Sequence, residues 1–164
     1  GGRGAEPQPD AGPGGGLRPV ILRRATAADA VAIGRLHHRT MRTSPPFLPE
    51  LHTPDEATTY VADKVLPACE VWVAEADGEL AGYIVFRPGW IDQLYVHPDR
   101  QGQGIGPRLL AQALADRAPR RLWTFQKNAR ARRFYEGRGF AVVEFTDGAG
   151  NEEQEPDVLY EWRP

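Results

Sequence analysis

The sequence is poor in cysteine, in lysine and in long apolar runs. Its single cysteine, Cys69, excludes an internal disulfide and is expected to be a small buried side chain, which favours a cytoplasmic protein. No apolar run approaches the ~20 residues that would span a bilayer. Residues 1–17 contain no continuous apolar segment, so no signal peptide is expected. The sequence therefore predicts no membrane association.

The net charge is also small, at −2 for 164 residues, and predicts no general attraction to nucleic acid. Residues 117–138 are basic, whereas residues 144–161 are acidic. Both stretches can be plain solvated surface, or they can face an anionic cofactor and a cationic substrate, respectively. The only lysines, Lys64 and Lys127, stand among many arginines, which we interpret as a genome composition of bacterial type.

Glycine and proline dominate the first residues, so residues 1–17 are expected to be disordered and residues 18–164 to form the folded domain. Hydrophobic alternation and turn signals predict strands at 20–25, 70–76, 79–86, 90–97, 121–126, 140–146 and 157–162. Helices are predicted at 26–40, 53–69, 106–118 and 128–139, with capping patterns at Thr26/Asp29 and Thr53/Glu56. A proline-rich loop is predicted at 44–52. This order predicts a single α/β (α+β) domain around one mixed, mostly antiparallel sheet.

One junction combines a strand, a glycine-rich loop and a helix. The loop reads QGQGIG at 101–106, and the helix follows directly. Glycines let the backbone approach a phosphate, and a helix N-terminus offers unpaired N–H groups to it. The Walker pattern fails for want of Gly-Lys-Ser/Thr, and the dinucleotide pattern fails because Pro107 stands where its third glycine would be. The loop alone thus predicts a pyrophosphate site, with an unliganded glycine turn as the alternative.

Two motifs together resemble the GNAT acyltransferase superfamily. QGQGIG at 101–106 is similar to its acetyl-CoA motif Q/R-x-x-G-x-G/A, and NARARRFYEGRGF at 128–140 is similar to its asparagine followed by FYExxGF. The resemblance covers roughly 18–163 and implies about seven strands, helices on both faces, and a V-shaped splay between the fourth and fifth strands.

The resemblance also implies how acetyl-CoA would bind. The pantetheine arm would lie in the splay against the backbone of the central strand, since an extended amide chain satisfies a sheet edge. Loop amides would hold the pyrophosphate, and Arg108 or nearby arginines the 3′-phosphate. The implied cofactor-binding residues are Leu94, Tyr95, Val96, Gln101, Gly102, Gln103, Gly104, Ile105, Gly106, Asn128 and Tyr135. Asn128 can equally be the N-cap of the helix that follows.

The resemblance implies catalytic roles for two residues. Tyr135 matches the tyrosine that protonates the departing thiolate, although a half-buried structural tyrosine is the alternative. Asp92 is a candidate base or ammonium anchor because strand alternation would place it on the face of Leu94. Glu75 and Glu79 are alternative bases, and His37, His38, His52 and His97 are further candidates. No histidine pair has a convincing metal-ligand spacing, so no metal is expected.

Three functions are compatible with these residues. The first is an N-acetyltransferase that uses acetyl-CoA on a small cationic amine, by direct attack in a ternary complex. The second is a protein or peptide N-acetyltransferase, and the third is a non-catalytic acyl-CoA-binding module, which would not need Tyr135. The acidic loop at 147–157 indicates a cationic acceptor, and the first function is preferred over the second because the proline-rich loop at 44–49 could close the open cleft that a peptide needs. A homodimer is compatible with the resemblance, whereas nucleic-acid partners are not expected.

Overall fold

The computed structural model describes residues 19–43, 53–151 and 153–164. The expected disordered segment at 1–17 and the proline-rich loop at 44–52 lie outside these residues. The strands are β1 (Val20–Arg24), β2 (Glu70–Ala76), β3 (Glu79–Arg87), β4 (Trp90–Val96), β5 (Arg120–Phe125), β6 (Ala141–Phe145) and β7 (Asp157–Trp162). The α-helices are α1 (Ala30–Thr43), α2 (Pro54–Tyr60), α3 (Ile105–Leu114) and α4 (Ala129–Glu136).

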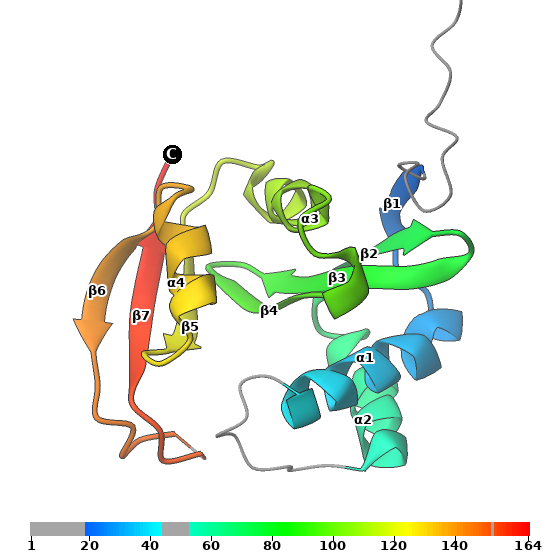
Figure 1. The fold of residues 1–164 in the computed structure, drawn as a ribbon, viewed down its shortest axis with the longest axis horizontal. Coiled ribbons are helices and arrows are strands. Elements are labelled where there is room, and N and C mark those ends of the chain that lie inside the picture. Colours follow the sequence, from blue (N-terminus) through cyan, green and yellow to red (C-terminus); the bar gives the residue numbers. More distant parts are fainter. Residues whose placement is uncertain (1–18, 44–52, 152) are drawn as a thin grey trace, which may run out of the picture.

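The seven strands form one sheet in the order β1-β2-β3-β4-β5-β7-β6. All neighbours pair antiparallel except β4 and β5, which run parallel. Helix α3 covers one face of the β1–β4 half, and α1 with α2 covers the other, while α4 lies over β5 and β7 (Figure 1). The mixed, mostly antiparallel sheet with helices on both faces confirms the predicted fold class.

Two apolar clusters hold these layers together. One unites α3 and α4 with β3, β4, β5 and β7, and it includes the fully buried Leu109 and Tyr160. The other packs α1 and the segment after α2 against β2 and β3, with Ile33 and Val73 at its centre. Since burial of such side chains drives folding at about 25 cal/mol per Å² of apolar area, the sheet is stabilised from both faces.

Helix starts follow the predicted capping patterns. Thr53 Oγ1 accepts from the Glu56 N–H at 3.1 Å, and the Glu56 carboxylate accepts from the Thr53 N–H at 3.2 Å. Thr26 and Asp29 form the same reciprocal box before α1. The helix predicted at 53–69 ends earlier, because α2 passes into a π-helical turn at Val61–Val65. None of the described helices is long and apolar enough to cross a bilayer.

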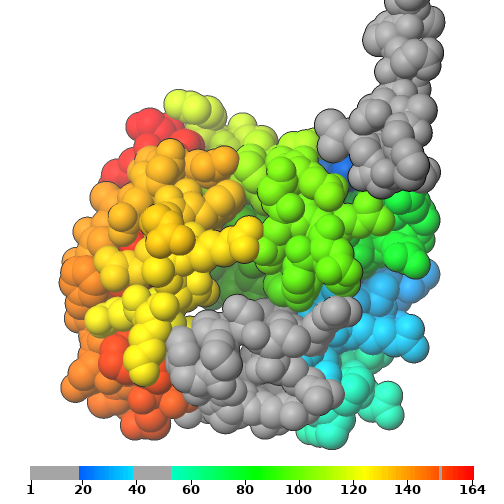
Figure 2. All heavy atoms as spheres, in the orientation of Figure 1, coloured from blue at the N-terminus to red at the C-terminus, as the bar shows by residue number. Residues whose placement is uncertain are grey.

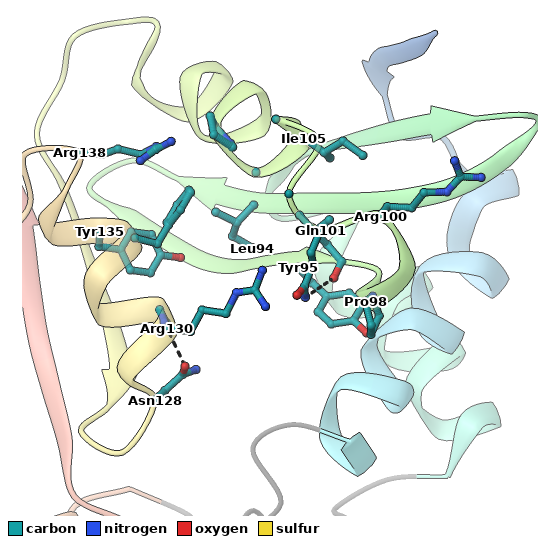
Figure 3. Close-up of a pocket in the computed structure, with 17 residues that line it drawn as sticks. Leu94, Tyr95, Pro98, Arg100, Gln101, Ile105, Asn128, Arg130, Tyr135 and Arg138 are labelled. Atoms are coloured by element: carbon teal, nitrogen blue, oxygen red, sulfur yellow. Dashed lines mark hydrogen bonds between the residues drawn. The ribbon is translucent and has the colours of Figure 1, made fainter. Parts of the chain in front are cut away.

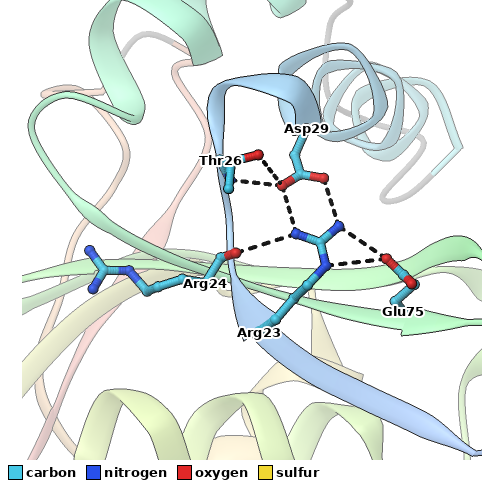
Figure 4. Close-up of polar contacts among 5 residues, drawn as sticks. All are labelled: Arg23, Arg24, Thr26, Asp29 and Glu75. Atoms are coloured by element: carbon cyan, nitrogen blue, oxygen red, sulfur yellow. Dashed lines mark hydrogen bonds and ion pairs between the residues drawn. The ribbon is translucent and has the colours of Figure 1, made fainter.

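The start of α1 is fixed to the sheet by one guanidinium. Arg23 on β1 donates to both carboxylate oxygens of Asp29 at 2.9 Å and to Glu75 Oε1 at 3.0 and 3.2 Å (Figure 4). Asp29 is only 7% exposed. Hydrogen bonds from Arg23, and more weakly from Thr26, lower the pKa of Asp29 below its ordinary value. Removing the guanidinium would therefore leave a buried carboxylate without its main partner.

We expect Arg23→Met to lower the free energy of unfolding by about 1–3 kcal/mol at pH 7, because a buried carboxylate loses its charged donors. A lowered pKa stabilises the fold above the unfolded pKa of Asp29, and this contribution is lost as the pH falls below about 4. The difference between the two proteins should therefore shrink at pH 3. Urea unfolding at both pH values measures it, and Arg24→Met is the control, since Arg24 is more exposed and makes one ion pair at 3.9 Å. Equal losses in both variants would contradict the assignment.

Candidate active site

A cavity of about 530 Å³ opens between β4, the loop at 98–106, the start of α3 and α4. In the space-filling view it lies between the yellow atoms of α4 and the green atoms of α3 and its preceding loop (Figure 2). The lining residues come from segments up to 44 positions apart, from Leu94 to Arg138. We call it the loop–helix cavity.

The splay of β4 from β5 provides the floor of this cavity. The two strands pair only at Trp90 and Arg121, near their first residues, and they diverge from there. The His97 N–H donates to Ala81 of β3 at 2.7 Å. Because hydrogen-bonding groups alternate along a strand, the backbone groups of Leu94 and Val96 point to the open edge. The predicted splay is present and leaves main-chain groups facing the cavity.

Two of the three β4 residues predicted to bind the pantetheine arm already use main-chain groups in hydrogen bonds within the protein. The same alternation directs the backbone groups of Tyr95 toward β3, where Tyr95 pairs with Tyr83, although Tyr95 still lines the cavity. The Val96 carbonyl already accepts from Gln101 Nε2 at 3.1 Å. Leu94 is therefore the residue of this edge whose main-chain N–H and carbonyl are best placed to bind a ligand. The Gln101 hydrogen bond connects the loop to β4.

The loop before α3 adopts a conformation that requires glycine. Gly102 and Gly104 have φ of +83° and +81°, in the left-handed region, and Gly104 is the N-cap of α3. No side chain caps this ten-residue helix, so its first N–H groups keep their positive partial charge at the cavity. Together, the loop and the helix start form a site suited to an anionic group such as a diphosphate.

Three arginines line the same cavity, and they were not individually predicted. Arg100 precedes the loop, while Arg130 and Arg138 lie at the two ends of α4; Figure 3 shows the Arg130 side chain extending from α4 toward β4. No aspartate, glutamate or histidine is among the described lining residues. Arg100 pairs with Asp77 at 3.3 Å, so Arg130 and Arg138 supply the positive charge of the cavity, as an anion requires.

Arg108, predicted as a partner of the 3′-phosphate, lies elsewhere. Its Nη1 donates to the Val20 carbonyl of β1 at 3.0 Å, and it does not line the cavity. The position of Arg108 on α3 turns its side chain toward the first strand. Arg130 and Arg138 are better placed, whereas Arg100 lines the cavity but pairs with Asp77 at 3.3 Å.

Asn128 combines both roles that the sequence allowed. Its Oδ1 accepts from the Ala131 N–H at 3.1 Å and so caps α4, while the residue also lines the cavity (Figure 3). Its amide nitrogen has no partner among the described residues. The capping bond orients the Asn128 side chain and leaves the two N–H donors of its amide group for a ligand.

Tyr135 lies on α4 with its hydroxyl directed toward the cavity (Figure 3). The residue is 8% exposed, and its ring packs at 5.2 Å from Phe134 and 5.3 Å from Phe140, between ring centroids. Burial raises the pKa of the Tyr135 hydroxyl above its ordinary value. This tyrosine therefore stays protonated near neutral pH and can act as a proton donor.

Helix α4 is anchored beneath Tyr135 by a polar contact with β7. The fully buried Tyr160 donates to Glu136 Oε2 at 2.5 Å and accepts from Arg132 Nε at 3.0 Å. Both partners belong to α4, on either side of Tyr135 in the sequence. The contact fixes the helix, and hence the tyrosine, relative to the sheet.

Asp92 is not brought to the loop–helix cavity, and the alternation used to place it fails. The β3–β4 register shifts opposite this residue, so that Gln93 pairs with Val85 but Ile91 with Phe86. A β-bulge of this kind adds a residue and changes which face follows. The Asp92 carboxylate accepts from Arg87 at 2.9 and 3.1 Å and lies 3.9 Å from Cys69 Sγ. Leu94 instead packs on the α3 side of the sheet.

Glu75, Glu79 and His97, which are the other predicted bases on or beside the strands, also lie outside the lining of the loop–helix cavity. Glu75 is bonded to Arg23, and Glu79 starts β3 at the exposed hairpin. His97 Nδ1 accepts from the Asp99 N–H at 3.0 Å and caps the turn before the loop. Of the remaining histidines, His38 is buried on α1, and His52 lies outside the described residues.

His37 belongs to a hydrogen-bonded chain on the opposite face of β4. Tyr83 is 1% exposed, and burial raises the pKa of its hydroxyl, which donates to Gln93 Oε1 at 3.0 Å. The Gln93 amide nitrogen is then the group that meets His37 Nδ1 at 3.0 Å and donates to it. Neutral His37 consequently carries its proton on Nε2, which makes it a hydrogen-bond donor rather than a ready base.

The structure therefore brings together most of the predicted residues. The residues predicted to bind the cofactor line the loop–helix cavity except Gln103 and Arg108, and Asp92 is also absent from its lining. Within the described ranges, no group of three or more His, Cys, Asp and Glu side chains could hold a metal ion.

Comparisons with known proteins agree with this geometry. A family model described as an acetyltransferase (GNAT) domain matches residues 67–142. The peptidyl-lysine N-acetyltransferase YiaC of Escherichia coli K12 is 30% identical over 126 residues, which cover 76% of this chain and 85% of YiaC. Rv2775 of Mycobacterium tuberculosis, an N-acetyltransferase by name, is 40% identical over 81 residues. That match covers 44% of this chain, and the chain spans about half (47%) of this relative's length.

Among solved structures, yncA of Salmonella typhimurium with acetyl-CoA superposes with a TM-score of 0.71 at 20% identity. The match covers 88% of this chain and 94% of that one. At this identity the likeness supports the fold.

Proposed function

The chain belongs to the GNAT acetyltransferase family, and we propose that it transfers an acetyl group from acetyl-CoA to a cationic primary amine in a ternary complex. The loop–helix cavity is the observation that carries this proposal. It combines an open strand edge, glycine-loop amides, an uncapped helix start and three arginines without a lining acid among the described residues.

The lining residues fit the parts of acetyl-CoA in turn. Amides of residues 101–106 and the cavity arginines hold the phosphates, through charge-assisted hydrogen bonds. The Leu94 carbonyl and the Asn128 amide bind the pantetheine arm, as in the addition of a strand to a sheet edge. Bound there, acetyl-CoA supplies an activated thioester carbonyl, and the Leu94 N–H is the donor that we assign to the carbonyl oxygen.

The proton transfers of this reaction can be assigned to Tyr135 and to water. The amine nitrogen forms a bond to the acetyl carbon, and the carbon–sulfur bond breaks. Tyr135, whose hydroxyl is directed toward the cavity, donates its proton to the departing sulfur and regains one from water. The ammonium acceptor loses one proton before it attacks and a second as the amide forms, and we assign water as the acceptor of both.

A positive charge on the acceptor is supported by the acidic loop between β6 and β7. This loop carries Asp147, Glu153 and Glu155, and Asp157 begins β7; Glu155 pairs with Lys127 at 3.5 Å. A small cationic amine is our first candidate. A peptidyl-lysine side chain is the second, and the similarity to YiaC over 85% of its length favours it. A non-catalytic binding module is less consistent with a buried, cavity-facing Tyr135.

Calorimetric titration with acetyl-CoA, followed by thiol release with a panel of amines, tests the proposal. We expect acetyl-CoA binding, and turnover with polyamines, amino sugars or lysine peptides that exceeds turnover with neutral or acidic amines. Because only the deprotonated amine attacks the thioester, kcat/KM should rise with pH toward the amine's pKa of about 10. Failure to bind acetyl-CoA would refute the proposal, and a preference for neutral or acidic amines would refute the charge argument.

A further inference from the structure

The tip of the β2–β3 hairpin reaches the arginine that precedes the glycine loop. Arg100 Nη2 donates to Asp77 Oδ2 at 3.3 Å, and the two side chains are 25% and 40% exposed, respectively. The contact joins residues that are 23 positions apart in the sequence. Arg100 lines the loop–helix cavity, whereas Asp77 is not among the described residues of its lining. The pair therefore connects the proposed coenzyme site to an acid outside it.

Both residues of this pair are attached to well-anchored backbone. Asp77 and Gly78 form the two-residue turn of the hairpin, with φ of +55° and +78°. On the other side, the His97 N–H donates to β3 at 2.7 Å, and the Arg100 N–H donates to the His97 carbonyl at 2.8 Å. Arg100 can therefore change its partner by rotation of its side chain, without movement of the backbone.

Arg100 also adjoins the amides that are proposed to hold the diphosphate, since it directly precedes residues 101–106. Figure 3 shows its guanidinium pointing away from Arg130 and Arg138. The contact with Asp77 thus holds one of the three cavity arginines away from the other two. Rotation of this side chain would bring a further positive charge toward a bound diphosphate.

The two possible partners of Arg100 differ in strength. Its contact with Asp77 is a single hydrogen bond between partly exposed groups, and such ion pairs contribute little to stability. A diphosphate offers several anionic oxygens, and a guanidinium can bind phosphate through two parallel N–H donors. An incoming diphosphate should therefore displace the carboxylate. Because the existing ion pair must first be broken, Asp77 reduces the affinity for the coenzyme.

We propose that Asp77 competes with the diphosphate of acetyl-CoA for Arg100, an inference that rests on the proposed use of acetyl-CoA. When acetyl-CoA binds, Arg100 exchanges the Asp77 carboxylate for a diphosphate oxygen. When CoA leaves, the carboxylate regains the guanidinium. Asp77 thereby weakens coenzyme binding and speeds the release of CoA after each turnover, since differences in affinity lie mostly in the dissociation rate.

Asp77→Asn removes the competing charge and preserves the turn, because Asn-Gly is a favoured two-residue hairpin loop. We expect this variant to bind acetyl-CoA and CoA about two- to fivefold more tightly at low salt, the range that a partly exposed ion pair allows. The dissociation rate of CoA should fall by the same factor. Calorimetric titration and stopped-flow displacement measure the two quantities.

Two further variants separate competition from a general effect of charge. Asp99→Asn removes an equal charge from the turn that carries Arg100, at a side chain that is 81% exposed, and should change the affinity by less than about 1.5-fold. In an Arg100→Gln background, Asp77→Asn should also have less than about this effect, because the competition needs the guanidinium. Equal gains in the two asparagine variants, or a gain that persists without Arg100, would overturn the inference.

A second ligand identifies the phosphate group concerned. 3′-Dephospho-CoA retains the diphosphate, so the gain in Asp77→Asn should persist with it, and loss of the gain would overturn the assignment to the diphosphate. The proposed function fails in a different way. If neither the wild type nor Asp77→Asn binds acetyl-CoA, the transfer and the competition are both refuted. Wild-type binding and turnover with an equal affinity in Asp77→Asn would refute the competition alone.

Discussion

Replacing Tyr135 with phenylalanine is expected to lower kcat about 10²- to 10³-fold, the usual contribution of a positioned general acid. The ring packs against Phe134 and Phe140 and should keep its place without the hydroxyl. The dissociation constant of acetyl-CoA should stay within about twofold, because transition-state interactions contribute little to ground-state binding. Initial rates and calorimetry measure the two quantities.

Tyr60→Phe serves as the control, because Tyr60 lies 48% exposed on α2, away from the loop–helix cavity. The pH profile adds an independent check. Burial raises the pKa of Tyr135 above its ordinary value of about 10, so its titration should not reduce kcat between pH 6 and 9. Unchanged turnover in Tyr135→Phe, or a falling limb in that range that the variant lacks, would remove the residue from the proposed role.

Substitution of Gly104 by valine should weaken acetyl-CoA binding by about 100-fold or more. With φ of +81°, Gly104 occupies a region that a β-branched residue avoids, so the loop must change conformation. Each charge-assisted bond from a displaced loop amide is worth about 1.5–3 kcal/mol, and about 2.7 kcal/mol corresponds to 100-fold in affinity. Calorimetric titration of the folded variant measures the loss.

The β2–β3 hairpin supplies a matched control. Gly78 has φ of +78°, and an added Cβ would meet nothing within 4 Å, as is also true at Gly104. Gly78→Val should therefore lower the free energy of unfolding by ~1–3 kcal/mol through the same kind of backbone strain as Gly104→Val. It should not weaken acetyl-CoA binding. Comparable affinities for the two valine variants would contradict the loop as the phosphate site.

Local patterns were sufficient to predict much of this protein. The capping boxes, the Asp77–Gly78 turn and the QGQGIG loop involve residues within a few positions of each other, so the sequence contains all the interacting groups. The order of strands and helices then predicted the mixed sheet, which the structure confirms. Tyr135 and Asn128 were found because they belong to one contiguous motif.

Features that depend on distant segments were predicted less well. Asp92 was assigned to the wrong face because the β-bulge arises from its pairing with β3. A local alternation rule contains no information about a shift in the partner strand. Arg108 or a nearby arginine was predicted to meet the 3′-phosphate, since many arginines compete in the sequence, and only packing shows that Arg108 turns to β1 while Arg130 and Arg138 line the cavity.

The sequence by itself determined the fold class, the glycine loop and the tyrosine, because backbone preference and hydrophobic period act over short separations. Tertiary structure alone decided where β4 and β5 separate and which side chains line the loop–helix cavity. These features arise where segments remote in sequence pack together, and the free energy of that packing belongs to the whole sheet rather than to any one stretch of the chain.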